Sequence, residues 1–154
     1  MPKFLSNSDK KTRQLAAKLA DAALSTKHQL KHALIIGLVG GLGAGKTTFI
    51  QGFAKALGIK KHLASPTFII MRRHGLPAKK LSKYTNLYHI DTYRLHSSKD
   101  LLALGIKDVL KDSSNIVLIE WADKIKKILP KDTLWLVFKH GRNEKERTIK
   151  LLGN

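Results

Sequence analysis

The stretch GLVGGLGAGKTT, residues 37–48, decides the fold of this chain. Within it, Gly40, Gly45, Lys46 and Thr47 satisfy the pattern G-x-x-x-x-G-K-[ST], whose glycines let backbone N–H groups approach phosphates closely. In this pattern the lysine reaches the β- and γ-phosphates, and the hydroxyl of the following residue binds Mg²⁺. The stretch therefore predicts a phosphate-binding loop followed by a helix, whose positive N-terminal end favours the same anion.

The residues on both sides of the loop have the patterns that such a loop requires. HALIIGLV, residues 32–39, is an apolar, branched run typical of a buried parallel strand. KTTFIQGFAKAL, residues 46–57, predicts a helix, and Gly58 stands where a helix commonly ends. We therefore expect strand, loop and helix in this order, with ATP and Mg²⁺ as cofactors. The residues expected to bind the nucleotide are Gly43, Ala44, Gly45, Lys46, Thr47 and Thr48.

Length and composition are typical of one globular domain, expected to span residues 1–154. Hydrophobic residues make up 43% of the chain, and the absence of cysteine excludes disulfides and thiolate metal sites. The sequence has no run of 18 apolar residues and no apolar signal core at its N-terminus, which predicts a soluble cytoplasmic protein without a membrane span.

The charge is strongly positive, with 29 basic and 11 acidic residues and a net charge of +18. Such a balance favours a polyanion such as nucleic acid, or an acidic protein partner; a solvated surface is the alternative. Few aromatic residues interleave the basic clusters, so stacking on single-stranded bases has little support. The basic clusters include Lys10-Lys11, Lys60-Lys61, Arg72-Arg73, Lys79-Lys80 and Lys126-Lys127.

The rest of the chain predicts an α/β fold with a P-loop NTPase-type sheet, mainly parallel with antiparallel additions and flanked by helices. Further helices are expected over residues 9–24, after the N-cap residue Ser8, and over a short stretch ending at Leu104. Strands are expected over residues 65–73, from residue 87 and over 115–121, with a basic loop before residue 87. TLWLVFK and RTIKLL predict a C-terminal antiparallel hairpin.

Two acids stand at the ends of predicted strands, where open α/β sheets place their ligands. Asp91 ends YHID, and Glu120 ends NIVLIE. Mg²⁺ is commonly bound by Thr or Ser, one or two carboxylates, phosphates and waters. Each acid is a candidate to bind the metal or to orient an attacking water; the alternative is an N-cap or an ion pair with Arg94 or Lys124.

Several other side chains are weaker candidates. His89 is a possible catalytic base, although a packed strand histidine is the more common arrangement. Trp121 is a candidate contact for nucleotide or a partner, with packing as the alternative. Arg94 and Arg142 are each candidates for an internal arginine finger, or for a surface ion pair.

The segments GLGAGKTTF, SPTF, YHIDTYRL, LGI, IEWADK, LP and GR, in this order and spacing, resemble the TsaE family, formerly YjeE. The resemblance covers residues 35–142. It implies a small bacterial P-loop ATPase required to form threonylcarbamoyladenosine next to the tRNA anticodon, acting with TsaD and TsaB. In that family TsaD does the transfer chemistry and the small ATPase supports its turnover. Contact with tRNA is expected directly or through the complex.

The resemblance also assigns roles to individual residues. Lys46 and Thr47 match the P-loop residues, Asp91 matches the acid of the H-x-D-x-Y-R-L segment, expected here to be catalytic, and Glu120 matches a Mg²⁺ ligand, with Thr47 as the other protein ligand. One residue departs from the family, which usually has an acid where this chain has Gly41; we expect this to affect hydrolysis or the metal environment more than binding. The loop over residues 72–86 also looks longer and more basic, which suggests a contact with tRNA or a partner.

Two other classes of function remain open from the sequence. A P-loop small-molecule kinase would transfer phosphate to a hydroxyl acceptor and would need an acceptor pocket. A nucleic-acid-binding module would use its ATP site only structurally and would bind RNA in a salt-sensitive way.

Overall fold

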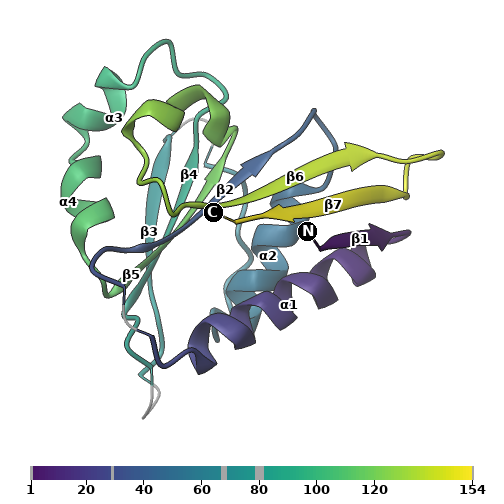
Figure 1. Cartoon of the computed structure of the whole chain (residues 1–154), viewed down its shortest axis with the longest axis horizontal. Coiled ribbons are helices and arrows are strands. Elements are labelled where there is room, and N and C mark those ends of the chain that lie inside the picture. The colour runs from purple at the N-terminus through teal and green to yellow at the C-terminus, as the bar shows by residue number, and fades with distance from the viewer. Residues whose placement is uncertain (1, 29, 67–68, 79–81, 154) are drawn as a thin grey trace.

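The computed structural model describes residues 2–28, 30–66, 69–78 and 82–153, and its centre is one seven-stranded sheet (Figure 1). The strands follow the order β1-β7-β6-β2-β5-β4-β3. The four central strands β6, β2, β5 and β4 are parallel, whereas β3 on one edge and β7 and β1 on the other pair antiparallel with their neighbours. The predicted α/β sheet with antiparallel additions and a C-terminal hairpin is confirmed. The strands are β1 (Lys3–Ser6), β2 (Leu34–Val39), β3 (Met71–Gly75), β4 (Asn86–Asp91), β5 (Asn115–Glu120), β6 (Leu134–His140) and β7 (Arg147–Leu152).

Helices cover both faces of this sheet, with α1 and α2 on one face and α3 and α4 on the other (Figure 1). The long helix α1 begins after Ser8, whose hydroxyl accepts a hydrogen bond from the N–H of Lys11, so the predicted N-cap is confirmed. No helix in the described ranges has the length and apolar character needed to cross a bilayer. The helices are α1 (Asp9–Ser25), α2 (Lys46–Ala56), α3 (Lys99–Ala103), α4 (Ile106–Lys111) and the 3-10 helix η1 (Ala122–Ile128).

Strand β5 separates two hydrophobic cores, and all six of its residues are buried. Ile116 and Leu118 pack in the core that contains α1 and α2. Val117 and Ile119 pack in the second core, which contains α3, α4 and η1. Because side chains alternate along a strand, Glu120 follows Leu118 onto the α2 face of the sheet. The alternation thus directs this acid toward the loop that precedes α2.

The structure differs from the sequence prediction between residues 65 and 75. The strand predicted over residues 65–73 begins only at Met71, and residues 67 and 68 lie outside the described ranges. The N–H groups of Ile69 and Ile70 both donate to the carbonyl of Pro66, and Ile70 has φ +71°, so the chain turns before the strand begins. Ser65 therefore lies outside the sheet, before the turn.

Candidate active site

The candidate residues meet where parallel strands end. Asp91, at the end of β4, is the register partner of Glu120 at the end of β5, and Glu120 is also the partner of Leu38 near the end of β2. Strand β2 leads into the predicted phosphate loop, and α2 begins directly after it at Lys46. The sheet topology therefore places the loop and both acids at one edge, although they lie far apart in the sequence.

The loop before α2 is shaped by glycines in backbone conformations that other residues rarely adopt. Gly43 has φ +71° and Gly45 has φ +99°. Gly45 is the residue directly before α2, and it has no side chain to cap that helix. The first N–H groups of a helix have no partner within the helix, so this end of α2 is suited to bind an anion.

The ammonium group of Lys46 lies inside the loop. The side chain is buried, and Nζ donates to the carbonyls of Gly40 at 2.6 Å and Gly41 at 2.8 Å. Nζ also lies 4.2 Å from the centre of the Trp121 ring, within the range of a cation–π contact. Burial lowers the pKa of Lys46, and nearby carboxylates oppose this shift, Glu120 most strongly.

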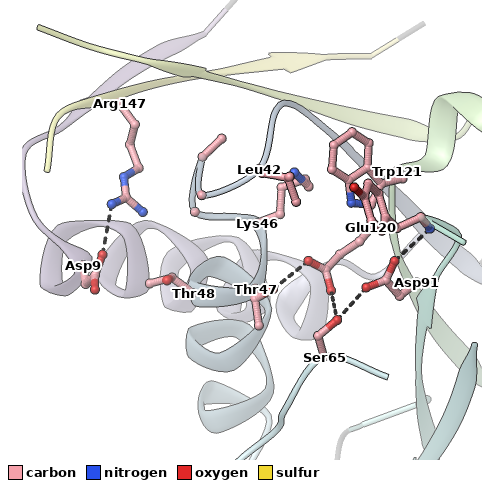
Figure 2. A pocket seen from close by; sticks show the side chains of 14 residues that line it. Asp9, Leu42, Lys46, Thr47, Thr48, Ser65, Asp91, Glu120, Trp121 and Arg147 are labelled. Atoms are coloured by element: carbon pink, nitrogen blue, oxygen red, sulfur yellow. Dashed lines mark hydrogen bonds and ion pairs between the residues drawn. The ribbon is translucent and has the colours of Figure 1, made fainter. Parts of the chain in front are cut away.

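Hydroxyl groups connect the two acids to the first turn of α2 and to each other (Figure 2). Thr47 Oγ1 donates to Glu120 Oε1 at 2.7 Å. Ser65 Oγ donates to Asp91 Oδ2 at 2.5 Å and lies 3.4 Å from Glu120 Oε2. His89 Nε2 lies 2.8 Å from Glu120 Oε2, and the His89 side chain is buried. The network fixes both carboxylates beside the N-terminus of α2.

Asp91 and the following turn also have structural roles. Asp91 Oδ1 accepts a hydrogen bond from the N–H of Tyr93, so the acid stabilises the chain turn after β4. Trp121, directly after β5, has φ +59°, and Thr92 Oγ1 lies 2.6 Å from its carbonyl oxygen. The rings of Tyr93 and Trp121 are in contact, with centroids 4.9 Å apart. The turns after β4 and β5 therefore support each other at the rim of the site.

The glycine loop, the start of α2 and the two acids line one pocket of about 460 Å³. This volume lies within the range of small-molecule sites, about 300–1,000 Å³. Every residue predicted to bind nucleotide, together with Asp91 and Glu120, contributes to its lining, although their roles stay predictions. The lining residues are Asp9, Leu42, Gly43, Ala44, Gly45, Lys46, Thr47, Thr48, Ser65, Asp91, Tyr93, Glu120, Trp121 and Arg147.

The sequence prediction missed other lining residues and chose two arginines that lie elsewhere. Arg94 and Arg142 are exposed and do not line this pocket. Arg147 does line it, and so does Asp9. The sequence does mark Arg147 as unusual, because it is a lone arginine at the start of an otherwise strand-like run. The run alone, however, does not show which residues Arg147 faces.

The oxygen atoms at this site are of the kind that Mg²⁺ prefers. They come from the Thr47 hydroxyl and the carboxylates of Glu120 and Asp91. Within the described residues, no group of three or more His, Cys, Asp or Glu residues is arranged to hold a metal. The Thr47 hydroxyl and the two carboxylates are the kinds of ligand that would bind Mg²⁺ together with phosphates and waters.

Comparisons with known proteins find similar sequences and a similar structure. The family model described as threonylcarbamoyl adenosine biosynthesis protein TsaE matches residues 6–149. A tRNA threonylcarbamoyladenosine biosynthesis protein TsaE from Bacillus subtilis is 39% identical over 124 residues, which is 78% of this chain and 71% of that protein. The protein of the same name from Haemophilus influenzae is 35% identical, over 71% of this chain and 65% of its own length.

One solved structure is similar over almost the whole chain. The crystal structure of Bacillus subtilis YdiB superposes with a TM-score of 0.74 and 28% sequence identity. The superposition covers 99% of this chain and 84% of that one.

Proposed function

The chain belongs to the TsaE family of tRNA threonylcarbamoyladenosine biosynthesis, and from this membership we propose that it binds and hydrolyses ATP to support formation of that modification. The observation that carries the proposal is the meeting of Lys46 and Thr47 with the carboxylates of Asp91 and Glu120 in one pocket.

In this proposal each residue has a defined task. The loop backbone and the N-terminus of α2 hold the phosphates, and Lys46 exchanges its two carbonyl partners for phosphate oxygens. Thr47 and Glu120 would hold Mg²⁺, which would supply positive charge to offset the negative charge of the phosphates. Asp91, fixed by Ser65 and by the N–H of Tyr93, orients the attacking water.

Membership of the TsaE family supports a role for this activity beside other proteins. We propose TsaD-like and TsaB-like partners, tRNA bound directly or through the complex, and a cytoplasmic location. Such a partner-dependent enzyme is expected to turn over slowly alone.

The test is release of inorganic phosphate from ATP by the protein alone, and then with TsaD, TsaB and tRNA added in turn. Turnover that rises on addition of these components supports the proposal. Turnover that stays the same with every addition contradicts the accessory role. Transfer of the phosphate to a hydroxyl acceptor from a metabolite panel, without release of inorganic phosphate, would favour a kinase instead.

A further inference from the structure

Arg147 lies at the end of the pocket opposite the two acids, with Lys46 between them (Figure 2). It is the first residue of β7, and its side chain is only 7% exposed. Its Nη2 lies 3.0 Å from Asp9 Oδ1, and its buried Nε has no hydrogen-bond partner among the described residues. Arg147 therefore places a largely buried positive charge, paired with one exposed carboxylate, in the wall of the pocket.

The guanidinium group packs directly against the phosphate loop. A Cβ placed on Gly45 would lie 2.1 Å from Arg147 Nη1 and 3.0 Å from its Cζ. The side chain therefore occupies the space beside the last glycine of the loop, just before α2. The side chain of its partner Asp9 is 55% exposed, so water screens much of the negative charge of Asp9. The positive charge of the guanidinium group can therefore still attract a second anion. A planar guanidinium fork suits phosphate oxygens particularly well.

The position of Arg147 indicates which phosphate of the nucleotide it would contact. Thr47 and Glu120 would hold Mg²⁺ in the proposed function, and this ion would offset negative charge on the terminal phosphates, so we assign their end of the pocket to the γ-phosphate. The loop backbone beside Gly45 cradles the α- and β-phosphates. Arg147 packs on this part of the loop, away from the acids.

We propose that Arg147 binds the nucleotide on its α-phosphate side and so serves affinity for ADP and ATP alike. This inference rests on the proposed function and deepens it. An arginine that contacts the γ-phosphate would instead act in the transition state and change kcat. Because ADP keeps the α-phosphate, loss of Arg147 should weaken ADP and ATP binding by the same factor and leave kcat nearly unchanged.

The experiment is calorimetric titration of the full chain with Mg·ADP and, separately, Mg·ATP. Arg147→Gln removes the charge, Arg147→Lys keeps the charge and removes the fork, and Arg142→Gln is the matched control at an exposed arginine of the β6–β7 turn. We expect Arg147→Gln to weaken both nucleotides at least about tenfold, equivalent to about 1.4 kcal/mol. Arg147→Lys should lie between wild type and Arg147→Gln, and Arg142→Gln should match wild type.

The other outcomes are equally definite. Melting of each variant without nucleotide shows whether it folds, and Arg147→Lys decides the question if Arg147→Gln does not fold. If wild type binds both nucleotides and the Arg147 variants bind them with the same affinity, this inference is overturned and the proposed function is not. A fall in kcat with equal ADP affinity would assign Arg147 to the γ-phosphate and also overturn it. Wild-type protein that binds neither nucleotide would overturn the inference together with the function on which it rests.

Discussion

In the proposed function, Lys46 exchanges its two carbonyl partners for phosphate oxygens. Its pKa is lowered by burial in the nucleotide-free protein. A phosphate next to the ammonium favours the charged form and raises that pKa again. The protonation of one buried lysine is therefore linked to nucleotide binding.

This linkage predicts proton uptake at alkaline pH. Between the lowered pKa of the free protein and the higher pKa of the complex, the bound state holds more protons, so affinity for ADP should fall as the pH rises through that window. Calorimetric titrations with ADP in two alkaline buffers of different ionisation enthalpy measure the proton uptake. Lys46→Arg, whose side chain stays charged, should bind ADP without this uptake. An ADP affinity that is independent of pH, with no proton uptake in wild type, would show that Lys46 does not face the phosphates.

The two acids are expected to act on turnover and not on binding. Asp91→Asn and Glu120→Gln keep the size of each side chain and remove its charge, so we expect ATP affinity within a fewfold of wild type and a kcat lower by about 100-fold or more. Phosphate release at saturating ATP, together with calorimetry, separates the two effects. Asp108→Asn, at an exposed position on α4, is the control. Wild-type turnover in both acid variants would remove these residues from the mechanism.

The sequence alone could predict some of the site residues but not others. Asp91 and Glu120 were predictable because each ends a strand run, and parallel strands in register bring such ends together. Arg147 was not predictable, because its partner Asp9 lies 138 residues away and they meet through the pairing of β7 with β1. Arg94 and Arg142 fitted the expected chemistry equally well as sequence, yet they lie exposed and outside the pocket.

The loop between β2 and α2 requires glycine at position 45 but not at position 41. Gly45 has φ +99°, and a Cβ there would collide with the Arg147 side chain. At Gly41 the nearest atom to an added Cβ is His140 Nε2, at an ordinary contact distance of 3.9 Å.

We therefore expect a large effect from a methyl group added at Gly45 and little effect from one added at Gly41. Gly45→Ala should lower the free energy of unfolding by about 1–2 kcal/mol, because alanine is disfavoured at positive φ, and should weaken nucleotide binding. Gly41→Ala should change it by no more than about 0.5 kcal/mol. Urea unfolding and ADP titration of both variants provide the measurement. Equal effects of the two substitutions would contradict the loop conformation.

Elements were predictable from the sequence where they were long and periodic. Helix α1, the strand–loop–helix unit and β5 agree with their patterns to within one or two residues. Strand β1 and helix α4 were missed, because four and six residues are too few to show a period. Strand β3 starts later than predicted because apolar Ile69 and Ile70 lie in a turn, where hydrogen bonds to Pro66 outweigh their preference for a strand.

For the whole molecule, the net charge of +18 favours association with polyanions. The basic stretch from Arg72 to Lys83 is partly outside the described ranges, at residues 79–81. Arg72 and Arg73 are exposed on β3, the strand at the edge of the sheet, and Lys83 donates to the carbonyls of Thr26 and His28. Charges on an edge strand also discourage strand pairing between molecules, which is the alternative role for these arginines.

If Arg72 and Arg73 contact tRNA phosphates, the double variant Arg72→Gln/Arg73→Gln should bind tRNA more weakly. The slope of log affinity against log salt should become shallower by up to about two, since each lost phosphate contact lowers it by about one. Filter binding over a salt series measures this. The variant Lys10→Gln/Lys11→Gln on α1 carries the same change in net charge and is the control. Loss of assembly with TsaD and TsaB at unchanged tRNA affinity would assign the arginines to a protein contact, and no change in either would leave them a surface role.

The central claim is that the pocket between the glycine loop and the two acids binds Mg·ATP through Lys46. Calorimetric titration of wild type and Lys46→Ala with ATP, with and without Mg²⁺, tests it most directly. We expect one ATP per wild-type chain and tighter binding with Mg²⁺. Lys46→Ala should bind ATP at least about tenfold more weakly, because a charge-assisted contact is lost. Equal affinity in Lys46→Ala, or a wild-type chain that binds no ATP, would contradict it.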